Sequence, residues 1–161
     1  MLSEYYIQVT GIILRIVPME GNCCGYLVTL RPDDGRRGTV QFVLTGETVV
    51  VDMRRLYPGM RAAMFYDTRL PMPLIYPPRY QAQLVTVLNR EEQVLLAYFD
   101  TNLVAAGGKL ALNLGRNTRI TTLNGQEFRC ELADQELLVY YTATTRSLPP
   151  QTTPRRVIVI C

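Results

Sequence analysis

The chain has 161 residues, of which 48 % are hydrophobic and 19 % are charged, a balance typical of a globular protein and unlike that of a disordered chain. Its 17 basic and 14 acidic residues give a net charge of +3, and a division at residue 89 leaves both halves close to neutral. The chain therefore lacks the strongly basic module that nucleic-acid-binding proteins usually contain.

The N-terminal segment carries no signal for export. Glu4 stands where a secretory signal peptide would carry basic residues, and no long apolar run follows it. No apolar run anywhere in the chain approaches the roughly 20 residues that a membrane-spanning helix needs. We expect neither a conventional signal peptide nor a membrane span.

The first half of the chain predicts a series of short β-strands. Val, Ile, Thr and Tyr recur in short clusters, and these residue types favour strands. Asp34-Gly35, within residues 33–37, predicts a hairpin turn, and Pro58-Gly59 predicts a second turn. We expect the strands at 5–17, 25–32, 38–44, 48–52, 61–66 and 84–88.

The second half predicts a similar series. Gly107-Gly108 and Asn124-Gly125 mark turns between its apolar clusters. No stretch has helical periodicity over the length that a stable helix needs. We expect strands near 93–99, 109–114, 118–123, 136–142 and 156–160.

Three blocks of the first half match three blocks of the second half in the same order. The pairs are residues 39–51 with 109–121, Phe65-Tyr66 with Tyr140-Tyr141, and Pro77-Pro78 with Pro149-Pro150. Self-similarity of this kind indicates an internal duplication. The sequence thus predicts two tandem repeats, at residues 1–89 and 90–161.

The fold class that we expect is all-β, with two tandem, duplicated small β-barrels of the OB-like or Greek-key kind and about five strands in each. Closing such a barrel removes the unpaired edges that an open sheet exposes. A single β-sandwich is the alternative.

Few residues offer catalytic chemistry. Histidine is absent, which removes the commonest general base and the commonest zinc ligand. The carboxylate pairs Asp33-Asp34 and Glu91-Glu92 fall in expected turns or linkers, where solvated charge is the usual state. No glycine-rich phosphate loop and no metal-ligand spacing is present. We expect no enzyme activity, no metal and no cofactor.

Four cysteines are candidates for intersubunit disulfides: Cys23, Cys24, Cys130 and Cys161. Adjacent cysteines rarely bond to each other, because their Cα atoms, 3.8 Å apart, are closer than a disulfide allows. The adjacent pair lies in an expected Gly-Asn-Cys-Cys-Gly turn, and the last cysteine ends the chain, so these sites predict exposed thiols. The other interpretation is four reduced thiols, partly buried, in a cytosolic protein.

A stiff, apolar, proline-rich loop follows the Phe65-Tyr66 block and predicts a contact with a partner. Proline lowers the ordering cost when such a loop docks. The alternative is that the loop folds back as a lid over its own barrel, which we favour for the corresponding loop at 145–154. The candidate contact residues are Met72, Leu74, Ile75, Tyr76, Arg79 and Tyr80.

Small barrels also bind single-stranded nucleic acid by stacking bases on aromatic side chains next to basic residues. The balanced charge disfavours this use, and packing between strands is the alternative role of the tyrosines. The aromatic candidates are Tyr26, Phe42, Tyr66, Tyr98 and Tyr141, with Arg31, Arg36 and Arg119 as the basic ones.

Four segments carry a resemblance: YYIQVTG (5–11), FYDTRLPMPLIYPPRYQA (65–82), YFDTNLVAAGGKLALNL (98–114) and YYTATTRSLPPQTTPRRVIVI (140–160). Over nearly its whole length the chain resembles a group of small, uncharacterised all-β proteins of spore-forming clostridia, which implies no known chemistry. In cysteine placement and β-rich composition alone, it is also similar to the disulfide-linked subunits of bacterial spore appendages.

Together these features predict a non-enzymatic structural protein that self-assembles as a fibre, filament or spore-surface subunit. In one form of this prediction, disulfides cross-link the subunits. The expected partner is the chain itself, and a spore surface or an extracellular fibre is favoured over the cytoplasm. The alternative function is an OB-like module that binds single-stranded nucleic acid or a glycan, and an enzyme's accessory domain is a third.

Overall fold

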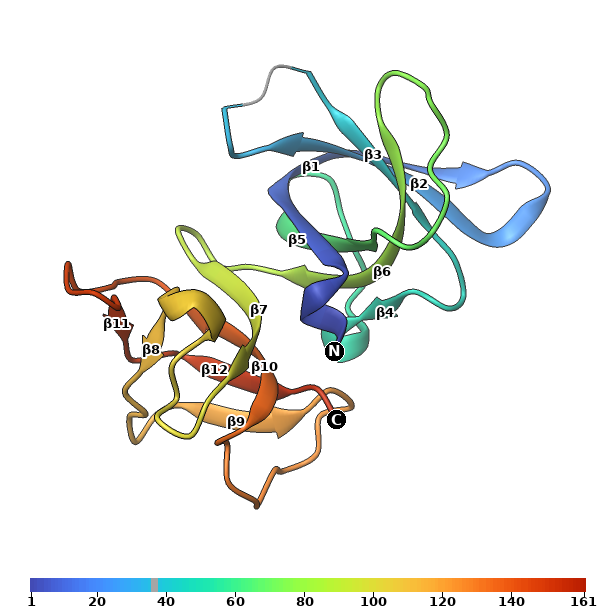
Figure 1. Cartoon of the computed structure of the whole chain (residues 1–161). Coiled ribbons are helices and arrows are strands. Elements are labelled where there is room, and N and C mark those ends of the chain that lie inside the picture. Colours follow the sequence, from blue (N-terminus) through green and yellow to red (C-terminus); the bar gives the residue numbers. More distant parts are fainter. Residues whose placement is uncertain (36–37) are drawn as a thin grey trace. The chain divides into compact units, whose positions relative to one another are not determined.

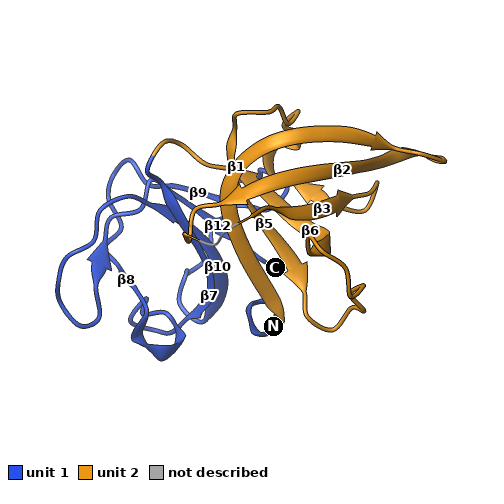
Figure 2. Ribbon diagram, turned by 90° about the horizontal axis from the view of Figure 1, so that it is seen from above, with its two compact units in different colours: residues 1–4, 91–161 blue, residues 5–90 orange. Residues whose placement is uncertain are grey.

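The computed structural model describes residues 1–35 and 38–161, and it confirms the all-β class. The chain forms two compact units (Figure 1). Unit 1 contains Met1–Glu4 and Glu91–Cys161, and unit 2 contains Tyr5–Arg90 (Figure 2). The units meet one residue beyond the expected division at 89/90, and the first four residues belong to unit 1 instead of the first repeat.

The described residues of unit 2 form six strands and a short 3₁₀ helix. The strands follow the order β3-β2-β1-β5-β6-β4. Because β3 also pairs with β6, the pairings from β3 through β2, β1, β5 and β6 lead back to β3. The elements are β1 (Tyr6–Met19), β2 (Asn22–Pro32), β3 (Val40–Leu44), β4 (Val49–Val50), η2 (Val51–Met53), β5 (Arg61–Asp67) and β6 (Arg79–Val87).

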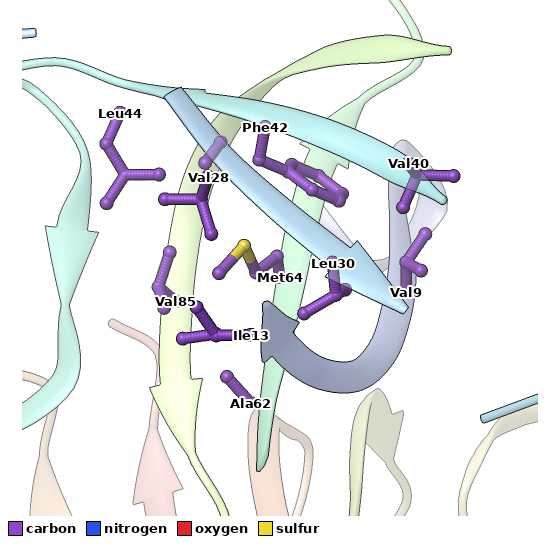
Figure 3. Close-up of a cluster of buried hydrophobic side chains, with 11 residues drawn as sticks. Val9, Ile13, Val28, Leu30, Val40, Phe42, Leu44, Ala62, Met64 and Val85 are labelled. Carbon is purple, nitrogen blue, oxygen red and sulfur yellow. The ribbon is translucent and has the colours of Figure 1, made fainter. Parts of the chain in front are cut away.

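Apolar side chains at alternate strand positions build the core of unit 2, as the period of two in a strand requires. In β3, Val40, Phe42 and Leu44 are buried while the residues between them are partly exposed. Gly11 allows β1 to approach β2, because a Cβ at this position would lie 2.0 Å from the carbonyl oxygen of Arg31. The core side chains of Figure 3 include Val9, Ile13, Val28, Leu30, Val40, Phe42, Met64 and Val85.

Unit 1 has a mixed sheet, with both antiparallel and parallel pairs, in the strand order β7-β10-β12-β9. It also has a separate two-stranded sheet, β11-β8. The main core includes Phe99, Leu110, Leu137 and Val157. The elements are η1 (Leu2–Glu4), β7 (Gln93–Phe99), η3 (Ala106–Gly108), β8 (Ala111–Leu112), β9 (Arg119–Thr122), β10 (Gln135–Tyr141), β11 (Gln151–Thr152) and β12 (Arg156–Val159). The named strands of unit 1 form two separate sheets and do not join into one closed sheet. The strand pairing therefore does not show the expected pair of closed barrels.

The N-terminal segment is bound within unit 1 by a buried carboxylate. Glu136, on β10, accepts hydrogen bonds from the backbone N–H groups of Leu2 (3.1 Å) and Ser3 (2.8 Å). An exposed segment would leave these donors to water, so this carboxylate explains why η1 belongs to unit 1.

Three strand pairs of unit 2 have counterparts in unit 1 with the same direction. The parallel pair β3–β6 aligns Gln41 with Arg79, and the parallel pair β8–β11 aligns Ala111 with Gln151. The backbone N–H groups of Gln41 and Ala111 donate to the carbonyl oxygens of Pro78 and Pro150, each at 2.8 Å. The pairs β4–β6 and β9–β12 are parallel, whereas β5–β6 and β10–β12 are antiparallel.

The clearest difference between the units is a long two-stranded ribbon in unit 2. β5 pairs with β1 only up to Ile12, and β3 pairs with β2 only from Tyr26 onward, so residues 14–25 extend past the neighbouring strands. Figure 2 shows this ribbon projecting from unit 2. Among the described strands of unit 1, none corresponds to its second strand.

Several expected strand limits were wrong. β2 begins at Asn22, so Cys23 and Cys24 lie in a strand and not in a turn. The strand expected at 48–52 is only two residues long, because the backbone enters η2 and Asp52 has a φ of 64°. β11 and the first half of β6 were missed. The turn expected at 33–37 includes Arg36 and Arg37, which lie outside the described residues.

Candidate assembly surfaces

The end of the ribbon displays two thiols. Cys23 and Cys24 are both exposed, and neither is part of a disulfide. The ladder between β1 and β2 shifts between Pro18–Tyr26 and Met19–Asn22, so the two cysteines have no partner residue in β1. The side-chain oxygen of Asn22 instead accepts a hydrogen bond from the N–H of Cys24 at 3.0 Å. The adjacent thiols are therefore held on an ordered strand and open to a reacting partner.

The other two cysteines belong to unit 1. Cys130 lies between β9 and β10, and Cys161 follows β12; both are exposed, free thiols. The exposure of Cys23, Cys24 and Cys161 matches the expectation for these sites, and Cys130, for which exposure was not predicted, is exposed as well. No pair of these four cysteines is joined within the chain.

The proline-rich loop between β5 and β6 presents apolar side chains to solvent. Leu74 is fully exposed and Tyr76 is 81 % exposed, while Met72 and Ile75 are each nearly half exposed. The hydroxyl of Tyr76 approaches Gly38, where a Cβ would lie 2.6 Å from it. The loop does not bury its four apolar residues under itself, as a lid would.

An ion pair fixes the beginning of this loop. Arg69 donates to both carboxylate oxygens of Asp67, at 3.0 Å from Nε and 2.8 Å from Nη2, and its backbone N–H also donates to Asp67. These hydrogen bonds hold the pKa of the Asp67 carboxyl below its ordinary value of 3.8 and raise the pKa of Arg69. The guanidinium also lies 4.1 Å above the ring of Tyr5.

Arg79 and Tyr80, which we expected in the contact loop, are instead the first residues of β6. Arg79 donates to the side-chain oxygen of Gln41 at 3.2 and 3.3 Å. Tyr80 stacks on Tyr66 with the ring centres 4.0 Å apart and contacts Phe42 at 5.5 Å. Both residues support the base of the loop and do not extend its exposed surface.

The second proline-rich loop differs from the lid that we expected. Leu148 is 97 % exposed, so it does not cover the core of unit 1. Hydrogen bonds order the loop: the Thr145 hydroxyl lies 2.6 Å from that of Ser147 and accepts from the N–H of Gln151 at 2.9 Å. The proline-rich loop of unit 1 thus exposes Leu148, and that of unit 2 exposes Met72, Leu74, Ile75 and Tyr76.

The aromatic side chains that we considered for base stacking have other contacts. Phe42 and Tyr66 pack with Tyr80, as described above. The Tyr98 hydroxyl donates to Asp134 at 2.7 Å, and this hydrogen bond raises the pKa of Tyr98. Burial raises the pKa of Tyr141. Tyr26 is the most exposed of the five, at the base of the ribbon.

One expected solvated carboxylate is buried. Glu92 is only 1 % exposed and accepts hydrogen bonds from Nε (2.6 Å) and Nη2 (3.0 Å) of Arg155. This pairing raises the pKa of Arg155. Asp33 is also paired, with Arg61 at 2.8 Å. The expectation of solvated charge was therefore wrong for Glu92, whereas Asp33 stays exposed although it is paired.

The strand register also creates a surface that the sequence alone did not reveal. One row of residues crosses the outer face of unit 2, with one residue on each of the adjacent strands β1, β2, β3 and β6. In this order the row consists of Arg15, Thr29, Gln41 and Arg79. Directly opposite residues share one face of a sheet. The neighbouring row on this face consists of Val17, Leu27, Val43 and Gln81.

Within residues 1–35 and 38–161, no three His, Cys, Asp or Glu side chains are grouped so that they could hold a metal ion. The same residues contain no helix that is long and apolar enough to span a membrane. No protein-family model matches the chain, and a search of curated proteins found no similar sequence.

Proposed function

We propose that the protein is a non-enzymatic structural subunit that assembles with further copies of itself. The observation that carries this proposal is the exposure of apolar side chains on two ordered projections of unit 2, the ribbon and the proline-rich loop. Clusters of exposed apolar residues mark surfaces that another protein covers. Leu74 and Tyr76 are the most exposed members on the loop, and Val17 and Leu14 are exposed on the ribbon.

Disulfide cross-links between copies extend this proposal. Each link would form from two thiols, which lose two protons and two electrons to an oxidant such as a small-molecule disulfide or oxygen. The exposed positions of the four cysteines support it, because a thiol must be accessible for exchange. The resemblance to clostridial proteins and spore-appendage subunits favours a spore surface or an extracellular fibre as the location.

The two units, in this proposal, are diverged copies of one OB-like barrel. An OB fold is a five-stranded Greek-key barrel, and the pairing β1-β2-β3-β6-β5-β1 has five members. The equivalent parallel and antiparallel pairs of unit 1, with their matching registers, support a common origin. Unit 1 also has the isolated bridges Phe99–Ala105 and Val104–Ala111, which follow β7 in the sequence as the second strand of such a barrel would.

Light scattering of the purified chain over a range of concentrations tests assembly. We expect particles larger than a monomer, and fewer of them in a Leu74→Ser/Tyr76→Ser variant. Met53→Ser is the matched control, because Met53 is 94 % exposed but lies on η2, outside both projections. A wild-type chain that stays monomeric at every concentration, with and without an oxidant, would refute the proposal.

The second candidate is an OB-like binding module, and the polar row on the outer face of unit 2 favours it. OB folds bind oligonucleotides and oligosaccharides on the face formed by their second and third strands. Thr29 and Gln41 lie on these strands, between Arg15 and Arg79. Titration with a single-stranded oligonucleotide or an oligosaccharide at low salt tests it; no binding at low salt contradicts it.

A further inference from the structure

Unit 2 and unit 1 carry opposite net charges. Unit 2 contains ten basic and six acidic residues, and unit 1 contains seven basic and eight acidic residues. The division at residue 89 conceals this difference, because it assigns Glu4 and Arg90 to the wrong units. Unit 2 therefore carries the net positive charge of the chain, while unit 1 is slightly negative.

The positive charge of unit 2 includes a defined face. Arg15 and Arg31 are exposed on the outer side of β1 and β2, and the outward positions within β1, β2 and β3 themselves hold no acidic residue; Asp33, which follows β2, is exposed and paired with Arg61. An apolar row lies next to the basic one. We call this surface the basic face and define it by Arg15, Val17, Leu27, Thr29, Arg31 and Val43.

Unit 1 has an exposed segment of complementary character at residues 123–134, which we call the acidic loop. Glu127, Glu131 and Asp134 are exposed there, against a single basic residue, Arg129. Arg129 is itself exposed and lies 3.2 Å from Glu127. The loop also carries Cys130, whose thiol is exposed beside Glu131.

From this charge complementarity we infer that the occupant of the basic face is the acidic loop of a second copy of the chain. The inference rests on the proposed assembly and specifies its contact. Unlike surfaces of two copies meet in this arrangement, which is a heterologous contact, and such contacts add copies in an open series when the rotation does not close a ring. The basic face of the second copy stays free to receive a third.

The contact also pairs cysteines from different copies. Met19 lies four residues beyond Arg15 on β1, about 13 Å away along the strand, and Asn22, beside Cys23, is opposite Met19. An acidic loop with Glu131 at Arg15 and Cys130 toward the end of the ribbon therefore places Cys130 within about 13 Å of Cys23 and Cys24. Cys130 of one copy and Cys23 or Cys24 of the next are the pair that a bismaleimide with a spacer of this length should join.

Charge reversal tests the contact. We expect Arg15→Glu and Glu131→Arg each to raise the concentration required for assembly by about tenfold, because like charges then meet across the contact. An equimolar mixture of the two variants should recover assembly, since each altered surface meets its complement on the other variant. Arg54→Glu is the matched control: it makes the same charge change at an exposed position outside the basic face.

The bismaleimide supplies an independent result. Mass spectrometry should find Cys130 joined to Cys23 or Cys24 between copies in the wild type, less in either variant and again in the mixture. Assembly of the Arg15→Glu variant at the wild-type concentration, or no recovery in the mixture of folded variants, would overturn the inference while leaving self-assembly intact. A wild-type chain that never assembles would overturn both.

Discussion

Thr48 and Thr118 make the same hydrogen bonds in the two units. The hydroxyl of Thr48 donates to the carbonyl oxygen of Ala82 at 2.8 Å, and that of Thr118 donates to the carbonyl oxygen of Pro154 at 2.7 Å. Each hydroxyl also accepts from the backbone N–H three residues earlier, at 3.0 and 3.1 Å. The two threonines thus connect the turn before β4 to Ala82 of β6 in unit 2, and the turn before β9 to Pro154, between β11 and β12, in unit 1.

Replacing Thr48 or Thr118 with valine should lower the free energy of unfolding by about 1–3 kcal/mol, because a backbone carbonyl and an N–H lose their partner. Serine at either position keeps the hydroxyl and should stay closer to the wild type. Urea unfolding, followed by circular dichroism, measures the difference. Equal stability of the valine and serine variants would show that these bonds contribute nothing net.

The Asp67–Arg69 pair should make stability depend on pH. Because the folded-state pKa of Asp67 is lowered, its contribution is present above the unfolded value of about 3.9 and is lost as the pH falls through the folded value. Arg69→Met should raise the Asp67 pKa, as a carboxyl NMR titration would detect. Asp67→Asn is the control, since it removes the titrating group. An unchanged Asp67 pKa in Arg69→Met would contradict the assigned cause.

Removing Arg155 should be costly, because Glu92 would remain buried without its bidentate partner. We expect Arg155→Met to destabilise the protein by about 3 kcal/mol. Glu92→Leu should cost less than Arg155→Met, because Arg155 keeps about half of its side chain in water. The double variant should be more stable than Arg155→Met alone. Thermal unfolding of the three variants gives the comparison, and an Arg155→Met variant as stable as the wild type would refute it.

Glu136→Ala should release the N-terminal segment from unit 1. The backbone N–H groups of Leu2 and Ser3 would then exchange with water faster, as hydrogen exchange followed by mass spectrometry can show. Glu131→Ala is the control, since it removes an exposed carboxylate of the same unit. Unchanged exchange at the N-terminus of the Glu136→Ala variant would mean that other contacts hold η1.

Local composition identified the long strands well. The run QVLLAYF predicts a strand at 93–99, and β7 has these limits. Two short strand segments were missed, because β11 and the start of β6 follow prolines and are defined by parallel partners rather than by their own residues. The ribbon was shortened in the prediction because Gly25 and Gly21 suggested one turn around the two cysteines.

The candidate sites could be predicted only where exposure follows from local sequence. The exposed cysteines and the apolar loop were of this kind. Burial of Glu92 depends on Arg155, 63 residues away, and neighbouring charges in a sequence do not reveal that partner. The basic face depends on the register between three strands, which places Arg15 and Thr29 opposite each other but leaves no trace in the residue types.

The bond between Glu136 and the first residues of the chain has a consequence for biosynthesis. Leu2 and Ser3 are synthesised long before Glu136, and the whole of unit 2 is made in between. Unit 2 can therefore complete its strand pairing on the ribosome while the N-terminal segment still lacks its acceptor. The segment with Leu2 and Ser3, although it is made before unit 2, therefore reaches its native place only after β10 has been made.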